Sequence, residues 1–320
     1  MSRRRLAAVA AAAAAFGWAL MTLGAFVRAS GSGLACPDWP SCHGQLVAGG
    51  SHPLIEEVHR WLATALVIAV VGIAAAIFRR HRRTPGLIRP VVAALGLVTL
   101  QVGLGGVTVL LRNVSWTVVL HYAAAALLVG SIVLVAVRLA SPPVTRAPRD
   151  TFTRLVRWFG AFSLLLLVAG STVANTDSHT ACGHDALLCG GSLLPGAEHH
   201  QVINFAHRLL ALSLVLAAVW VARRARRERT RGNAIPRVAA GVAALYLIQA
   251  ATGLVVMGMG DSVALDVIHS SLASLTWVAV ALLLSLTFTL APGAGSTPST
   301  PTDTRPAAAT RLPAATAAPT

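Results

Sequence analysis

The chain has 320 residues, of which 55% are hydrophobic and 12% are charged, and its mean hydropathy is +0.69. Soluble globular proteins carry roughly 25% charged residues, so this composition excludes a soluble enzyme, a disordered chain and a small disulfide-rich protein. The net charge of +15 does not indicate nucleic-acid binding, because the basic residues are all arginines and cluster between apolar segments.

Apolar segments of about 20 residues, the length that crosses a bilayer core, recur along the whole chain. They predict membrane spans at residues 6–28, 57–78, 91–111, 117–138, 158–177, 202–222, 238–258 and 265–291. The first segment resembles a signal peptide but is predicted to be retained, because Gly24 and Gly170 each precede a cysteine by 12 residues. Residues 292–320 are rich in Pro, Thr and Ala and are predicted to form a disordered cytoplasmic tail.

The loop charges predict the orientation of the chain in the membrane. Arginines cluster in alternate gaps, at residues 3–5, 79–89, 138–157 and 223–237. The positive-inside rule makes that side cytoplasmic and places both termini inside. The opposite loops contain all four cysteines. Because the outside is normally oxidising, two local disulfides are expected, Cys36 with Cys42 and Cys182 with Cys189.

An internal repeat with an offset of 148 residues relates the two halves of the chain. The offset joins His59 to His207, His121 to His269, Arg60 to Arg208, Gln101 to Gln249 and Gly105 to Gly253. The predicted fold is therefore an all-α integral membrane protein with eight transmembrane helices. These form two tandem four-helix bundles related by a pseudo-twofold axis along the membrane normal. The expected division is 1–140 and 158–291 for the halves, 141–157 for an Arg-rich cytoplasmic linker and 292–320 for the tail.

Four of the 11 histidines are predicted at the outer ends of even-numbered spans: His59, His121, His207 and His269. An imidazole within a membrane span is costly and indicates function. A single one is more often an interhelical hydrogen bond, but four in repeat favour a ligand pair in each bundle. Haem iron takes two axial imidazoles, whereas structural zinc, the rival, usually needs four close ligands. The other seven histidines are expected to be solvated.

Neighbouring residues extend this interpretation. Glycines in the third and seventh spans would let a flat macrocycle approach the backbone, or would serve close helix packing; they are Gly103, Gly105, Gly106 and Gly253. Arg60 and Arg208 each follow a histidine and are expected either to contact haem propionates or to snorkel at the interface.

The two halves differ at one chemical position. Glu56 precedes His59 by three residues and shares its helical face, whereas the repeat-equivalent residue is Asn204. This difference predicts one reactive haem site and one electron-transfer site. Asp266 also precedes His269 by three residues, but a carboxylate near a helix N-terminus is stabilising without any other role. Glu57 is predicted to be a solvated residue at the helix end.

The segment GLACPDWPSCHG, followed by EEVHR and by three further histidines in register, resembles the haem A synthase family. The resemblance covers residues 6–291. It implies a membrane oxidoreductase of terminal-oxidase assembly that converts haem O to haem A by oxidising a methyl group to a formyl group. It also implies that Cys36 and Cys42 correspond to the family's outer-loop cysteine pair.

The resemblance further implies the role of each ligand residue. Substrate haem would bind between His59 and His121, with Glu56 as the catalytic residue, and a haem b cofactor would bind between His207 and His269. The expected partners are an enzyme that produces haem O, an electron donor outside the chain, and membrane lipid.

Two other functions agree with parts of the pattern. A di-haem b-type cytochrome that only transfers electrons would show the same duplication and the same four histidines. A thiol-oxidising membrane protein could use the two cysteine pairs, but their spacing differs from the CxxC motif in which reactive thiols often occur. Glu56 opposite Asn204, together with the CPDWPSC segment, favours the enzyme.

Overall fold

The fold is known from a computed structural model, which describes residues 1–45, 47, 49–142, 150–183, 185, 188–260 and 262–290. Within these residues there are eight helices long and apolar enough to cross a membrane, and no β-strand. They are α1 (Arg3–Ala29), α2 (Ser51–Arg80), α3 (Ile88–Leu110), α4 (Ser115–Ala140), α5 (Thr151–Asn175), α6 (His199–Ala225), α7 (Ala234–Met259) and α8 (Val263–Thr289). The predicted multi-pass, all-helical fold is confirmed. The expected tail, residues 292–320, lies outside the described residues.

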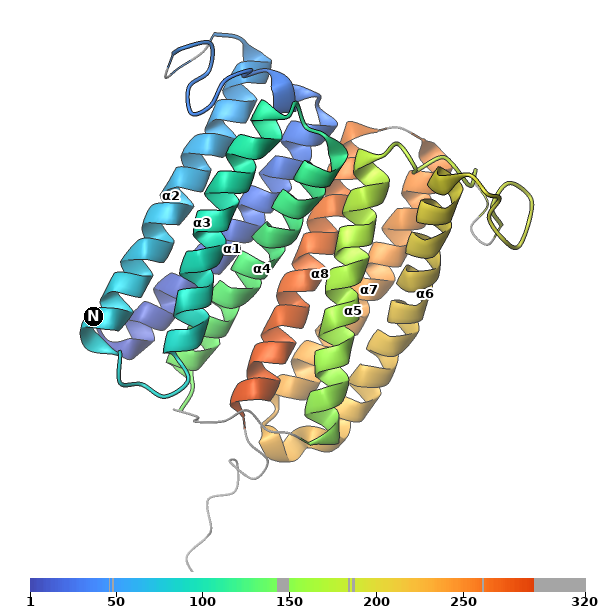
Figure 1. Cartoon of the computed structure of the whole chain (residues 1–320). Coiled ribbons are helices and arrows are strands. Elements are labelled where there is room, and N and C mark those ends of the chain that lie inside the picture. Colours follow the sequence, from blue (N-terminus) through green and yellow to red (C-terminus); the bar gives the residue numbers. More distant parts are fainter. Residues whose placement is uncertain are drawn as a thin grey trace, which may run out of the picture.

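The helices form two groups of four, α1–α4 and α5–α8, which stand side by side in Figure 1. In the first group each helix packs on its neighbours in sequence, and α4 closes the ring by packing on α1. In the second group α8 closes the ring on α5 in the same way. Even-numbered helices therefore stand diagonally across their bundle, α2 opposite α4 and α6 opposite α8. The diagonal pairs are the helices that contain the four histidines.

Helices α1, α4, α5 and α8 form the interface between the two groups, through α1–α8, α4–α5 and α4–α8 contacts. The Trp18 indole donates to the Ser271 carbonyl oxygen at 3.1 Å, and the Trp277 indole donates to the Ala126 carbonyl oxygen at 2.7 Å. At the end of this interface where α1 ends and α8 begins, Arg28 pairs with Asp266 at 3.6 Å. Hydrogen bonds and an ion pair thus fix the two groups against one another.

The alanine-rich segment of α1 packs in the core of the first group. Ala7, Ala10, Ala13 and Ala14 are buried there against α2, α3 and α4. Small side chains let membrane helices approach closely, so this segment serves as packing surface. The burial agrees with the prediction that α1 is a span of the folded protein.

Two helices begin several residues earlier than predicted. Helix α5 starts at Thr151, because Asp150 accepts hydrogen bonds from the Thr153 amide and hydroxyl groups and caps the helix. Residues 151–157 are therefore helical, and their assignment to a linker was wrong. Helix α2 starts at Ser51, so Glu56 lies in its second turn and His59 further inside, away from the helix end.

Both disulfide-containing loops project from the same end of the molecule, one beside α2 and the other beside α6 (Figure 1). Cys36 is bonded to Cys42, and Cys182 is bonded to Cys189. The two predicted local disulfides are present. In each loop the second cysteine begins a tight turn, closed by paired main-chain hydrogen bonds from Cys42 to Gln45 and from Cys189 to Ser192.

Candidate functional site

Each of the four histidines rests against a glycine of a neighbouring helix. A methyl group added at Gly24 would lie 3.2 Å from the His59 ring, and one at Gly105 would lie 3.3 Å from the His121 ring. In the second group, a methyl group added at Gly170 would lie 3.1 Å from the His207 ring, and one at Gly253 would lie 3.2 Å from the His269 ring. In this sense each glycine seats the ring of its histidine. A larger residue at any of these positions would displace an imidazole. The repeated glycines therefore position histidine rings.

The remaining glycines named by the sequence behave differently. Gly106 lies against the Trp39 indole, and no side-chain atom comes within 4 Å of a methyl group placed at Gly103. The four glycines of the third and seventh spans therefore do not share a single role. Gly105 and Gly253 give space to a histidine, and Gly106 gives space to a residue of the first disulfide loop, residues 35–45.

The imidazoles form two pairs, each across one bundle. His59 and His121 are near enough to interact electrostatically, and so are His207 and His269. The Nδ1 atoms of His59, His121 and His207 are buried and have no hydrogen-bond partner. Two imidazoles aimed into a four-helix bundle, with unsatisfied ring nitrogens, are a suitable donor set for haem iron. Among the described residues, no three His, Cys, Asp or Glu side chains gather as a zinc site would need.

Glu56 is almost fully buried, at 4% exposure, and contacts the first disulfide loop. Its Oε2 atom accepts a hydrogen bond from the Cys36 amide at 3.0 Å, and its Oε1 atom pairs with Arg60 at 2.6 Å. Since α2 begins five residues earlier and the helix dipole acts mainly within the first turn, helix capping does not explain this carboxylate. Glu57 is also buried, at 3% exposure, so the prediction that it is solvated was wrong.

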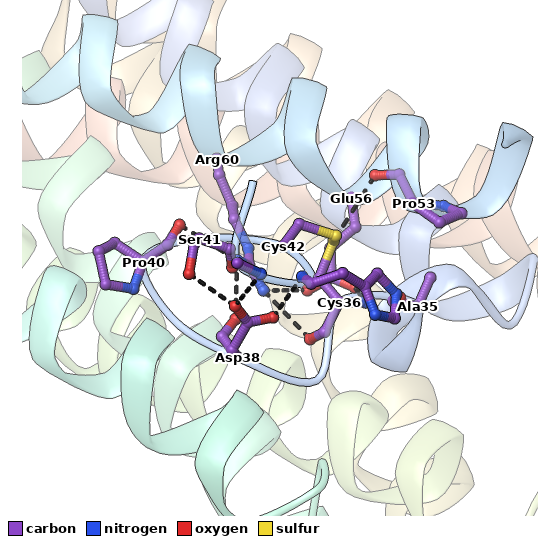
Figure 2. The surroundings of a disulfide bond; sticks show 11 residues. Ala35, Cys36, Asp38, Pro40, Ser41, Cys42, Pro53, Glu56 and Arg60 are labelled. Atoms are coloured by element: carbon purple, nitrogen blue, oxygen red, sulfur yellow. Dashed lines mark hydrogen bonds and ion pairs between the residues drawn. A yellow bond between two sulfur atoms is a disulfide. The ribbon is translucent and has the colours of Figure 1, made fainter. Parts of the chain in front are cut away.

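Arg60 holds the first disulfide loop onto α2, as Figure 2 shows. Its Nη1 atom donates to the carbonyl oxygens of Ser41 at 2.8 Å and Asp38 at 3.0 Å, and its Nη2 atom reaches Glu56. Weaker contacts join it to the carbonyl oxygens of Pro40 and Cys36. A haem propionate contact by Arg60 stays a prediction. These hydrogen bonds place the CPDWPSC loop over the N-terminal part of α2.

Asp38 stabilises the same loop from within. Its carboxylate accepts hydrogen bonds from the Ser41 hydroxyl at 2.6 Å, the His43 amide at 2.6 Å and the Gly44 amide at 2.9 Å. These donors lower the pKa of Asp38 from 3.8 to about 2. Because the folded pKa is depressed, the stabilisation is present above pH 3.8 and is lost as the pH falls through about 2. The loop therefore keeps this contact at physiological pH.

The second group repeats this arrangement with an amide in place of the carboxylate. Asn204, at 4% exposure, donates to the main-chain carbonyl oxygens of Ser178 and His179, while its own Oδ1 atom has no partner. Arg208 donates to the carbonyl oxygens of Asp185 at 2.6 Å and Gly183 at 3.0 Å. Arg208 thus holds the second disulfide loop as Arg60 holds the first, and its predicted propionate contact likewise stays a prediction.

Trp39 connects the first disulfide loop to α3. Its indole lies 3.3 to 3.5 Å from the position of a methyl group at Gly106, next to the Gly105 that seats His121. The repeat places Leu254 at the position of Gly106. The loop therefore bridges the helix of His59 and the helix that seats His121. No sequence pattern predicts this contact, because it joins a loop to a helix distant along the chain.

A second repeated contact also went unpredicted. The His52 Nδ1 atom lies 2.8 Å from the Ser32 hydroxyl, and the His200 Nδ1 atom lies 2.9 Å from the Ser178 hydroxyl. Both serines are fully buried. Each pair ties the beginning of α2 or α6 to the segment that follows the preceding helix. The offset of 148 between His52 and His200 was the available signal. The prediction that both are ordinary solvated residues made no use of it.

Comparison with known proteins is decisive for the family. Residues 7–57 and 52–281 match the cytochrome oxidase assembly protein family. The chain belongs to this family. It is 29% identical to a haem A synthase of Shouchella clausii over 83% of this chain and 88% of the relative. It is 28% identical to a haem A synthase of Symbiobacterium thermophilum over 82% of this chain and 89% of the relative. This membrane protein is thus a member of a haem-associated family.

A third relative has a different name and a longer chain. A protoheme IX farnesyltransferase of Thermus thermophilus is 29% identical over 80% of this chain, but the match covers only 44% of the relative. A segment similar to this chain therefore occurs there within a protein that contains much additional sequence.

Proposed function

We propose that this chain is a haem A synthase, which oxidises a methyl group of haem O to the formyl group of haem A for terminal-oxidase assembly. The observation that carries the proposal is a repeated pair of glycine-seated histidines, with a buried carboxylate beside only one pair. Relatives named haem A synthase match most of the chain and support the same function. A cytochrome that only transfers electrons would have no use for the difference between Glu56 and Asn204.

We assign the substrate to the first bundle. Haem O would bind between His59 and His121, and Trp39 and the disulfide loop would cover the outer end of that bundle. Oxidation of the methyl group to a formyl group breaks C–H bonds at the ring edge and forms a bond to oxygen, with the electrons passing to an oxidant outside this chain and the protons to a base. A carboxylate close to that edge stabilises developing positive charge or accepts a proton. Glu56 supplies this group, held in place by Arg60 and by the Cys36 amide.

We assign a haem b cofactor to the second bundle, between His207 and His269. When bound, haem b supplies one-electron transfer. The buried Nδ1 atom of His207 and the glycine seats of both rings support this assignment. Asn204 carries no charge, so this bundle has no equivalent of the Glu56 carboxylate. The interface of α4 with α8 joins the helices of His121 and His269 and gives electrons a short route between the bundles.

The proposed partners follow from the reaction. Haem O must come from an enzyme that adds a farnesyl group to haem, and the similarity to a Thermus protein named protoheme IX farnesyltransferase supports such a partner. Electrons are exchanged with a redox partner outside this chain. Membrane lipid surrounds the apolar outer faces of both bundles.

Product analysis tests the function directly. In cells that produce haem O, expression of the chain is expected to give haem A, identified by pigment extraction and mass measurement. The control is the same host with an empty vector. Haem b and unchanged haem O alone, from a protein that is present in the membrane, would favour the electron-transfer cytochrome.

We also propose that both termini are cytoplasmic, that residues 1–140 and 151–291 are the two halves, and that a pseudo-twofold axis along the membrane normal relates them. Alternate arginine clusters support the orientation, and the paired α1–α8 and α4–α5 contacts support the axis. A reporter fused after Leu290 is expected to be active in the cytoplasm, and one fused after Gly190 is expected to be active outside. A C-terminal reporter that is active only outside would exclude this topology.

A further inference from the structure

His269 differs from the other three histidines in the surroundings of its Nδ1 atom. The Thr252 hydroxyl lies 3.2 Å from this nitrogen. The same hydroxyl lies 2.9 Å from the Gln249 carbonyl oxygen, to which it donates. A threonine hydroxyl has a single proton, so this bond leaves only its lone pairs for the histidine. With the hydroxyl proton in the bond to Gln249, the ring is the donor and neutral His269 carries its proton on Nδ1.

The Gln249 side chain does not change this assignment. Its amide nitrogen lies 3.1 Å from Nε2, 3.2 Å from Nδ1 and 3.1 Å from the main-chain oxygen of His269. The main-chain oxygen accepts a hydrogen bond in every tautomer of the ring. The amide therefore has a partner in α8 whichever ring nitrogen carries the proton.

The first bundle lacks this hydroxyl. The repeat places Leu104 at the position of Thr252, and the Nδ1 atom of His121 is buried with no hydrogen-bond partner. The neighbouring glutamine and glycine are retained, since Gln101 lies 3.2 Å from the Nε2 atom of His121 and Gly105 seats the ring. One side chain thus separates two otherwise matched histidine environments.

We propose that Thr252 is a positioning residue that orients His269 as a strong haem ligand, whereas Leu104 leaves His121 a weaker one. This inference rests on the proposed function, in which one bundle holds a resident cofactor and the other binds a substrate. An acceptor on the far nitrogen of a ligating histidine fixes its tautomer, orients the ring and increases its basicity. A cofactor must be retained through many turnovers, while the substrate must leave as product. The difference between Thr252 and Leu104 matches those two needs.

The purified full-length protein loaded with haem b tests the inference through Thr252→Val, which keeps the side-chain shape and removes the hydroxyl. Loss of an outer-shell partner typically weakens metal binding 10- to 100-fold, so haem transfer to added apomyoglobin is expected to accelerate by about that factor. The midpoint potential of the low-spin haem is expected to become more positive, because a less basic imidazole stabilises ferric iron less. Thr252→Ser, which retains the hydroxyl, is expected to restore both values.

Two further variants complete the design. Thr99→Val removes a hydroxyl bonded only to the Leu95 carbonyl oxygen of its own helix and is expected to change neither value. Leu104→Thr is expected to slow the release of haem from the first bundle. Unchanged transfer rate and potential in Thr252→Val would overturn the inference while leaving the proposed function intact. Failure of the proposed function is a different result, namely a wild-type protein whose haem does not depend on His207 and His269.

Discussion

Alanine in place of His207 or of His269 is expected to remove the low-spin haem b from the purified protein. In the proposed arrangement these two rings are the axial ligands of the cofactor, and each is held by a glycine of a neighbouring helix. Two imidazoles give iron a strong axial field and hence a low-spin spectrum. Loss of either ligand leaves a large apolar macrocycle with one bond to the protein. The haem content per chain, and the spectrum of any remaining haem, measure the effect.

His200→Ala is the matched control, because His200 lies on the same helix but its Nδ1 atom contacts the Ser178 hydroxyl. This variant is expected to retain haem b. The corresponding variants in the first bundle, His59→Ala and His121→Ala, are expected to keep haem b and to lose haem A formation. A full complement of unchanged haem b in both His207→Ala and His269→Ala would place the cofactor elsewhere.

The histidine pairs were predictable because each histidine of the first pair recurs 148 residues later in the second half. Span length and the arginine clusters can be recognised from local composition, and the 148-residue offset from a comparison of the two halves. Together these signals predicted eight helices and the helix on which each histidine lies. The glycines were recognised as repeated, but their partners were not. Whether Gly105 contacts a histidine or a macrocycle depends on the rotation of two helices about their axes, which no single segment specifies.

The contacts of the first disulfide loop with α2 and α3 account for most of what could not be predicted from sequence. The predicted start of α2 was late because Ser51, His52 and the two glutamates lower the hydropathy of the first two turns, although both glutamates are buried. Arg60 was expected at a lipid or propionate surface, yet it binds carbonyl oxygens of the loop. These contacts depend on how a disulfide-closed segment folds back on the helix, and their spacing in sequence carries no information about that path.

Glu56→Gln is expected to abolish or strongly reduce haem A formation while haem b remains bound. Glutamine keeps the shape of the side chain, and its carbonyl oxygen can still accept the Cys36 amide hydrogen bond. It loses the charge that pairs with Arg60 and that would stabilise or deprotonate the reacting methyl group. General acid–base groups contribute roughly 10²- to 10⁴-fold, so haem O or a partly oxidised product is expected to accumulate. Mass measurement of the extracted pigments reports each species.

Glu57→Gln is the matched control, since Glu57 is the adjacent residue of the same helix and is equally buried. It tests whether loss of any buried carboxylate at this end of α2 disturbs the bundle. Retained haem b in both variants, with intact Cys36–Cys42 linkage in Glu56→Gln, would exclude general misfolding as the cause of lost activity. If Glu56→Gln forms haem A in wild-type amounts, the carboxylate has no catalytic role. Its contacts to Arg60 and the Cys36 amide would then identify it as a structural anchor of the outer loop.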